Sequence, residues 1–158
     1  MVLPGGDSTL NVYIFGGKVS MKVGIYNHQH MQGSCPICRQ TYVQGMMQDA
    51  LSCQSKAHMV YGSDLEFVNY TDLGNYPPEN LDRPGFRRMM QDVEDGRLDV
   101  IIVIRLDKIS NDVDLILNTY ERMKAHGVEL LTLKEGKRAM EVLDKALIRR
   151  AEKQQQSS

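Results

Sequence analysis

The sequence has no tryptophan, only three cysteines and no long hydrophobic run. Its longest aliphatic run, Val100–Ile104, is far shorter than the roughly 20 residues that span a bilayer, so no membrane association is expected. The N-terminus lacks the basic and apolar segments of a signal peptide. An odd number of cysteines without a secretory signal predicts reduced thiols and a cytoplasmic protein.

The sequence also lacks an excess of charge of either sign, because its formal net charge is -1. This excludes a protein that binds nucleic acid through overall basicity, although a local basic patch remains compatible with it. The 158 residues are 42% hydrophobic and 25% charged, which is typical of one soluble domain. Such a chain can bury a core without disulfides or metals, and we expect no cofactor.

The first twenty residues differ in composition from the rest. Two apolar runs, Leu10–Phe15 and Lys18–Tyr26, are separated by two glycines, which is a hairpin signal. The alternative is that residues 1–20 are a leader and that the domain begins at Met21.

From Met21 onward, strand and helix patterns alternate. Strands are expected at Met21–Tyr26, Leu65–Tyr70, Val100–Ile104 and Val128–Leu133. Apolar residues recur at helical spacing in Val43–Leu51, Phe86–Val93, Val113–Tyr120 and Glu135–Lys153. These units predict an α/β fold in three layers, with a mostly parallel sheet of four to five strands flanked by helices.

Ligands of such sheets bind at the carboxyl ends of the strands. Two segments are expected there as loops, Asn27–Cys38 and Arg105–Asn111, and Thr71–Asp82 is expected to be an exposed loop. The methionines of the helices, Met46, Met47, Met89 and Met90, are expected to fill the core.

The text YTDLGNYPPENLDRPGFRRMMQDVEDGRLDVIIVIRLDKISND, followed by HGVELLTL, resembles the catalytic domain of serine recombinases, the resolvase/invertase family. The resemblance covers Met21–Leu133. It implies a resolvase-like catalytic domain over residues 21–134, and leaves a short helix and polar tail over residues 135–158 with no helix-turn-helix domain.

Members of this family cut DNA with a serine at the end of the first strand, which attacks a backbone phosphate and stays joined to it. Arginines stabilise the phosphate and the transition state through charge-assisted hydrogen bonds. The resemblance therefore implies DNA as a partner, self-association into a homo-oligomer, and a role in site-specific DNA recombination or integration.

The first family motif is altered in this sequence. The family pattern Tyr, any, Arg, any, Ser falls on Tyr26 to His30, so the nucleophile position is His30 and the first arginine position is His28. Neither Ser34 nor Ser110 is expected to replace the missing serine. Loss of the nucleophile predicts a pseudo-enzyme.

The second motif is altered as well. Its pattern Asp, Arg, any, any, Arg falls on Asp107, Lys108 and Asn111, directly after Arg105. Two further residues match family positions: the resemblance implies a phosphate-binding role for Arg83 and makes Asp72 the loop acid. Residues that the resemblance suggests for DNA contact are Arg83, Arg87 and Arg88.

Other interpretations stay open. The chain is an active recombinase fragment if the first motif is misaligned or if another residue replaces the missing serine. Separately, a histidine nucleophile at His30 is chemically possible. It is a small zinc- or thiol-dependent protein if His28, His30, Cys35 and Cys38 bind zinc, or if Cys35 and Cys38 are redox-active as in glutaredoxins. The basic segment after Lys134 is either an amphipathic surface helix or the family's dimerisation helix.

Overall fold

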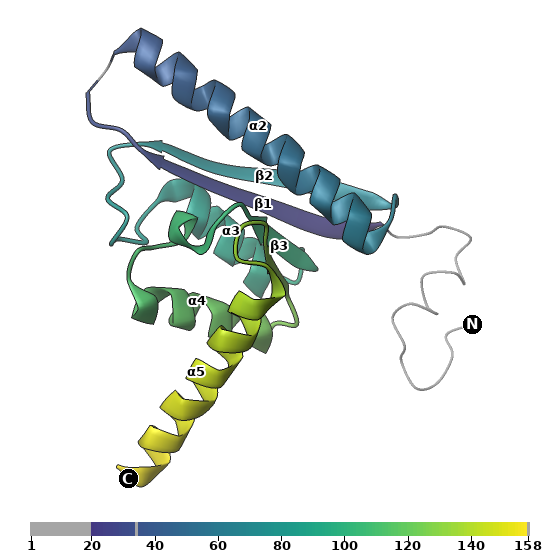
Figure 1. The fold of residues 1–158 in the computed structure, drawn as a ribbon, viewed down its shortest axis with the longest axis vertical. Coiled ribbons are helices and arrows are strands. Elements are labelled where there is room, and N and C mark those ends of the chain that lie inside the picture. Colours follow the sequence, from purple (N-terminus) through teal and green to yellow (C-terminus); the bar gives the residue numbers. More distant parts are fainter. Residues whose placement is uncertain (1–19, 34, 158) are drawn as a thin grey trace.

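The computed structural model describes residues 20–33 and 35–157 (Figure 1). Its strands are β1 (Met21–His30), β2 (Leu65–Gly74), β3 (Val100–Val103) and β4 (Glu129–Thr132). Its helices are α2 (Pro36–Tyr61), α3 (Pro84–Glu94), α4 (Val113–Ala125) and α5 (Gly136–Gln156), with a 3-10 turn, η1 (Leu106–Lys108). The hairpin or leader expected over residues 1–20 lies outside the described residues except for Ser20, and so does Ser34.

The four strands form one parallel sheet in the order β2-β1-β3-β4. Every residue of β3 is buried, and its sequence VIIV is accordingly apolar on both faces. Helices connect successive strands, as parallel pairing requires. The structure confirms the predicted α/β fold of a parallel sheet flanked by helices.

The two faces of the sheet have separate cores because successive side chains of a strand point to opposite faces. Val23 and Ile25 of β1 face α2 and pack in one cluster with Cys53 and Ala57. Tyr26 belongs to the other, larger cluster, which includes residues of α3, α4 and α5. Figure 1 shows α2 alone on one side of the sheet, with α3 and α4 on the other.

Strands β1 and β2 are longer than the sequence predicted. β1 continues past Tyr26 to His30 and β2 continues past Tyr70 to Gly74, in register with each other. β3 pairs with β1 only as far as Tyr26, so the last residues of β1 and β2 form a two-stranded ribbon. The expected loops at Asn27–Cys38 and Thr71–Asp82 therefore begin as strand, because pairing across the ribbon extends both segments.

Helix α2 begins at Pro36 and is much longer than the segment Val43–Leu51 in which the helical pattern was found. Met89 and Met90 are buried as predicted, whereas Met47 and Leu51 are each 62% exposed. The prediction of a core position was wrong for Met47 because the first half of α2 lies beside the ribbon, where the sheet is only two strands wide (Figure 1).

Helix α5 packs on α4 and on β4 at the edge of the sheet. Leu143 is buried in the larger core, and Met140 and Leu147 pack against it. Arg150 also bonds to α4, through Asn118 at 2.7 Å. The helix continues to Gln156, so residues 154–156 of the expected polar tail are helical. None of the helices in the described part of the chain is long and apolar enough to cross a membrane.

Candidate functional site

The carboxyl end of β1 carries the residues that the resemblance places at the reaction centre. Tyr26, His28 and His30 are two residues apart on an extended strand, so their side chains point to the face that α3 covers. Asp72 lies opposite His28 in the neighbouring strand β2. The site is therefore built on the strand ends of a parallel sheet, where such folds bind ligands.

Arg83, directly before α3, is completely buried, with 0% of its surface exposed. Its Nε donates to the carbonyl of Asn80 at 2.9 Å, and its Nη1 donates to the Tyr26 hydroxyl at 2.7 Å. Nη1 also donates to the carbonyl of Lys108 at 3.2 Å, and Nη2 donates to the carbonyl of Ile109. The guanidinium thus ties together β1, the loop before α3 and the end of η1, and all three of its nitrogens have protein acceptors.

Asp72 caps the N-terminus of α3 from the adjacent strand. Its carboxylate accepts the backbone N–H of Gly85 at 2.8 Å and of Phe86 at 2.9 Å, and the hydroxyl of Tyr26 at 2.8 Å. A Cβ at Gly85 would lie 2.7 Å from the carbonyl oxygen of Thr71, so only glycine allows this close approach of α3 to β2. The carboxylate satisfies two of the N–H groups that a helix start leaves without partners.

Tyr26 connects these two charged groups. Burial raises the pKa of its hydroxyl well above the ordinary value, although the nearby Arg83 opposes that shift. The hydroxyl therefore stays protonated at neutral pH, accepting from Arg83 while it donates to Asp72. It holds the network together and is not poised to act as a nucleophile.

His28 is buried and lies next to this network. Its Nε2 is 2.7 Å from the carbonyl oxygen of Tyr76, and because a carbonyl only accepts, Nε2 carries a hydrogen. Burial, and then the Arg83 guanidinium, lower the pKa of His28. The imidazole is accordingly neutral at pH 7.

Lys108 is the cation that reaches the end of β1 from η1. Its Nζ donates to the carbonyl of His28 at 3.2 Å. Burial, and then the charge of Arg105, lower the pKa of Lys108, while Asp49 and Asp107 oppose the shift. Lys108 is half-buried and is engaged by the backbone of β1.

His30 lies on the ribbon, opposite Gly74 of β2. Its side chain is half-buried, and its Nδ1 is buried without a hydrogen-bonding partner among residues 20–33 and 35–157. The hydrogen-bonding partners of Arg83 and Asp72 do not include His30. The structure thus assembles His28, Asp72, Arg83 and Lys108, and leaves His30 at the margin of this group.

The opposite face of the ribbon holds a polar contact that we did not predict. The amide of Asn27 donates to Asp49 of α2 at 3.1 Å. The alternation of side chains along β1 could have indicated this contact, because it places Asn27 on the same face as Val23 and Ile25, toward α2. A buried polar residue at that register needs a partner on the helix, and Asp49 supplies it.

The remaining predicted residues face solvent. Arg105 and Asp107 pair with each other at 3.1 Å, and Asn111 is exposed. Arg87 pairs with Asp82 at 3.3 Å on the surface, next to the exposed Arg88.

Ser110 is buried, and its hydroxyl bonds within the loop before α4. It donates to the carbonyl of Pro78 at 2.9 Å and accepts the N–H of Asp112 at 3.0 Å. Its oxygen holds two loops together.

The structure does not assemble the four zinc ligands considered above. Over residues 20–33 and 35–157, no group of three or more His, Cys, Asp or Glu side chains is placed to hold a metal ion. His28 is buried and bonded to Tyr76, whereas Cys35 and Cys38 are exposed at the start of α2.

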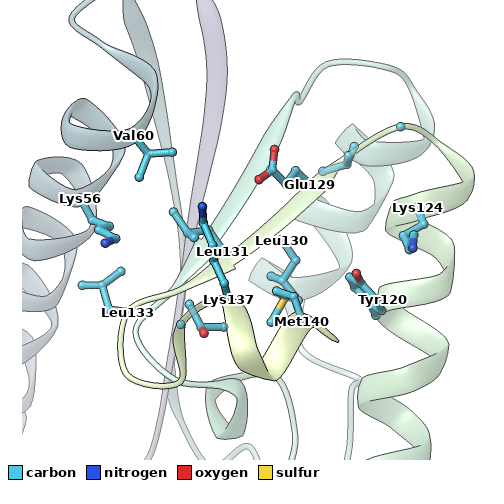
Figure 2. A pocket seen from close by; sticks show the side chains of 14 residues that line it. Lys56, Val60, Tyr120, Lys124, Glu129, Leu130, Leu131, Leu133, Lys137 and Met140 are labelled. Atoms are coloured by element: carbon cyan, nitrogen blue, oxygen red, sulfur yellow. The ribbon is translucent and has the colours of Figure 1, made fainter. Parts of the chain in front are cut away.

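A separate cavity of about 520 Å³ lies at the edge strand β4 (Figure 2). Lys56 and Val60 of α2 lie on one side of the strand with Leu133, and Tyr120, Lys124 and Met140 lie on the other. None of the predicted site residues lines this cavity. It is therefore distinct from the strand-end site.

Comparison with known families identifies the class of the protein. The family model described as "Resolvase, N terminal domain" matches residues 38–155, which is well over half of the chain. The chain belongs to the resolvase family, as its sequence predicted. No curated protein gives a significant match.

Solved structures agree with this assignment. The N-terminal catalytic domain of TP901-1 integrase is 21% identical with a TM-score of 0.55, over 83% of this chain and 97% of that one. A resolvase family site-specific recombinase from Streptococcus pneumoniae is 25% identical with a TM-score of 0.55, over 87% of this chain and 93% of that one. The C-terminal catalytic domain of ISC1926 TnpA, an IS607-like serine recombinase, is 13% identical with a TM-score of 0.56, over 72% and 70%. The fold is that of serine recombinase catalytic domains.

Proposed function

We propose that this protein is a recombinase-type domain that associates with DNA and with copies of itself but does not cut DNA. The observation that carries the proposal is the state of Arg83. This residue matches the family's phosphate-binding arginine, yet it is fully buried and all three guanidinium nitrogens donate to the protein itself. To bind a phosphate, it would have to leave acceptors that then remain buried without a donor.

The residues around Arg83 support the same conclusion. His28 occupies the position of the family's first arginine, and its lowered pKa leaves it without positive charge at pH 7. A neutral imidazole cannot provide the bidentate, charge-assisted contact that a guanidinium makes with phosphate. Each lost donor of this kind typically costs about 3–4 kcal/mol of transition-state stabilisation.

The nucleophile position argues in the same direction. His30 stands where the family has serine, and the hydroxyl that contacts Arg83 belongs to Tyr26, whose pKa is raised. Loss of a covalent nucleophile costs on the order of 10⁴-fold or more in rate. Together with the lost arginines, this would leave no measurable cleavage.

Strand cleavage is tested with supercoiled plasmid, quenched with detergent and examined for covalent protein–DNA adducts. We expect no adduct and no nicked product from the wild-type protein under conditions in which an active serine recombinase gives both. His30→Ser is expected to remain inactive, because Arg83 stays buried and His28 stays uncharged. An adduct in the wild type that disappears in His30→Ala would overturn the proposal.

Association with DNA rests on the exposed side chains before and within α3. Arg87 and Arg88 are exposed, and Arg87 would exchange its surface ion pair with Asp82 for a contact with phosphate. In fluorescence anisotropy with a duplex, we expect weak binding that decreases steeply with salt. Replacing both by alanine should reduce the slope of log K against log salt by about 2.

Arg97→Ala is the matched control, because Arg97 is exposed and forms a surface ion pair as Arg87 does, but it lies beyond the end of α3. It should leave the slope close to that of the wild type. Absence of binding at about 50 mM salt, or an equal loss in Arg97→Ala, would refute DNA association through α3. Self-association is measured by light scattering at micromolar concentration, and a strict monomer would contradict it.

A further inference from the structure

The turn between β1 and α2 contains two cysteines that the proposed function does not use. Cys35 is the N-cap residue of α2, and Pro36 occupies the first helical position. The backbone N–H of Cys38 donates to the Sγ of Cys35 at 3.4 Å. Both thiols are exposed, whereas the third cysteine, Cys53, is buried against the sheet.

The two thiols also influence each other's ionisation. Interaction with the Cys38 thiol, and then with the backbone N–H of Cys38, lowers the pKa of Cys35. The same interaction raises the pKa of Cys38. The first turn of α2 has no acidic residue, so nothing there offsets the positive end of the helix dipole.

We propose that Cys35 and Cys38 form a reversible dithiol–disulfide pair that reacts with low-molecular-weight disulfides such as glutathione disulfide. Cys35 is the attacking residue and Cys38 the resolving one. Exposure, an N-cap position and a backbone N–H bonded to the sulfur together are features of reactive rather than structural cysteines. The inference concerns the start of α2 and is independent of strand cleavage.

The chemistry balances in two exchange steps. The Cys35 thiolate attacks one sulfur of the small disulfide, forming a mixed disulfide and releasing one small thiolate. Cys38 loses its proton and attacks the Cys35 sulfur, closing the protein disulfide and releasing the second small thiolate. The protein gives up two thiol hydrogens and two electrons, and the small disulfide is reduced to two thiols.

The geometry at the helix start suits this bond. Residues three apart in a helix are separated by about 5 Å between Cα atoms, which is within the range that disulfides bridge. Ile37, between the two cysteines, is largely exposed, so the turn is open to a small molecule. Because the backbone N–H of Cys38 already bonds to the Cys35 sulfur, closing the disulfide does not require α2 to unfold.

The experiment equilibrates the full chain with defined ratios of reduced and oxidised glutathione, alkylates free thiols and measures the mass. We expect one intramolecular disulfide, lost in both Cys35→Ser and Cys38→Ser and retained in Cys53→Ser. Cys38→Ser should accumulate glutathione on Cys35, because the resolving thiol is missing. Glutathione on both cysteines of the wild type without ring closure would overturn the proposal.

A second measurement follows alkylation by iodoacetamide against pH. Cys35 should react at least about 10-fold faster than the buried Cys53 at pH 7, and its rate should rise at lower pH than that of Cys38. Equal pH profiles for Cys35 and Cys38 would contradict the assigned roles. One equivalent of zinc that blocks alkylation of both cysteines would instead identify a metal site and refute the redox pair.

Discussion

Nη1 of Arg83 lies 2.7 Å from the hydroxyl oxygen of Tyr26, although the two residues are far apart in the sequence. The same hydroxyl donates to Asp72, so a cation, a phenol and a carboxylate form one buried chain. Buried charges are tolerated when every hydrogen-bonding group is satisfied, and they become costly when one member is removed. Arg83 therefore stabilises the fold.

The first prediction concerns Arg83→Lys. Lysine keeps the charge, but its compact ammonium cannot reach all the acceptors that the guanidinium fork binds. Carbonyls of the surrounding loops would be left buried without donors, at a cost of about 2–4 kcal/mol. Thermal unfolding followed by circular dichroism should show a melting temperature roughly 5–15 °C lower.

The exposed Arg87→Lys is the matched control, and it should change stability by less than about 0.5 kcal/mol. If Arg83→Lys melts at the wild-type temperature, the guanidinium does not serve the fold. Burial of Arg83 would then not oppose phosphate binding.

Gly85→Ala should destabilise the protein although alanine is the better helix former. The added Cβ would lie 2.7 Å from the Thr71 carbonyl oxygen and 3.0 Å from the Asp72 carboxylate oxygens, which displaces the cap of α3. Loss of the cap and overpacking together cost about 2–4 kcal/mol, more than the gain of about 1 kcal/mol in helix propensity. Urea unfolding measures the difference.

Gly45→Ala in α2 is expected to have the opposite effect on stability. Nothing lies within 4 Å of a Cβ at Gly45, so only the helix propensity changes, and we expect about 0.5–1 kcal/mol of stabilisation. A Gly85→Ala variant as stable as Gly45→Ala would show that the approach of α3 to β2 relaxes easily.

The third prediction is a pH dependence caused by His28. Its pKa is lower in the folded protein, so the unfolded chain takes up a proton more readily. The contribution of His28 to the free energy of unfolding is therefore fully present above the ordinary histidine pKa of about 6.5. It decreases as the pH drops below that value. Urea midpoints between about pH 5 and pH 8 should increase with pH, and His28→Gln should show a smaller increase.

His58→Gln serves as the control, because His58 lies on the exposed surface of α2. It should retain the wild-type dependence on pH. An unchanged slope in His28→Gln would mean that another group causes the loss of stability in acid.

The fourth prediction tests the docking of α5 on α4. Leu143 is 7% exposed in the core, whereas its neighbour Val142 is 61% exposed. Leu143→Ala should cost about 2–3 kcal/mol, because it removes buried methyl groups and leaves a cavity. Val142→Ala should stay within about 0.5 kcal/mol of the wild type, and equal effects in thermal unfolding would contradict this packing.

Periodicity predicted most of the fold. The buried strand VIIV and the amphipathic pattern of α3 follow from local spacing of apolar residues, and both are confirmed. The predicted ends of β1 and β2 were wrong, because the length of each strand depends on pairing between segments far apart in the chain. The prediction that Met47 is buried was wrong for a related reason, since its exposure depends on how wide the sheet is beneath α2.

The amino-acid sequence alone determined the family, the order of strands and helices, and the absence of serine at the end of the first strand, because these are properties of residue identity and spacing. Only the tertiary structure decided that Arg83 is buried by acceptors from three separate segments and that His28 is uncharged. Burial and hydrogen bonding arise from groups that chain folding brings together, and local sequence does not specify them.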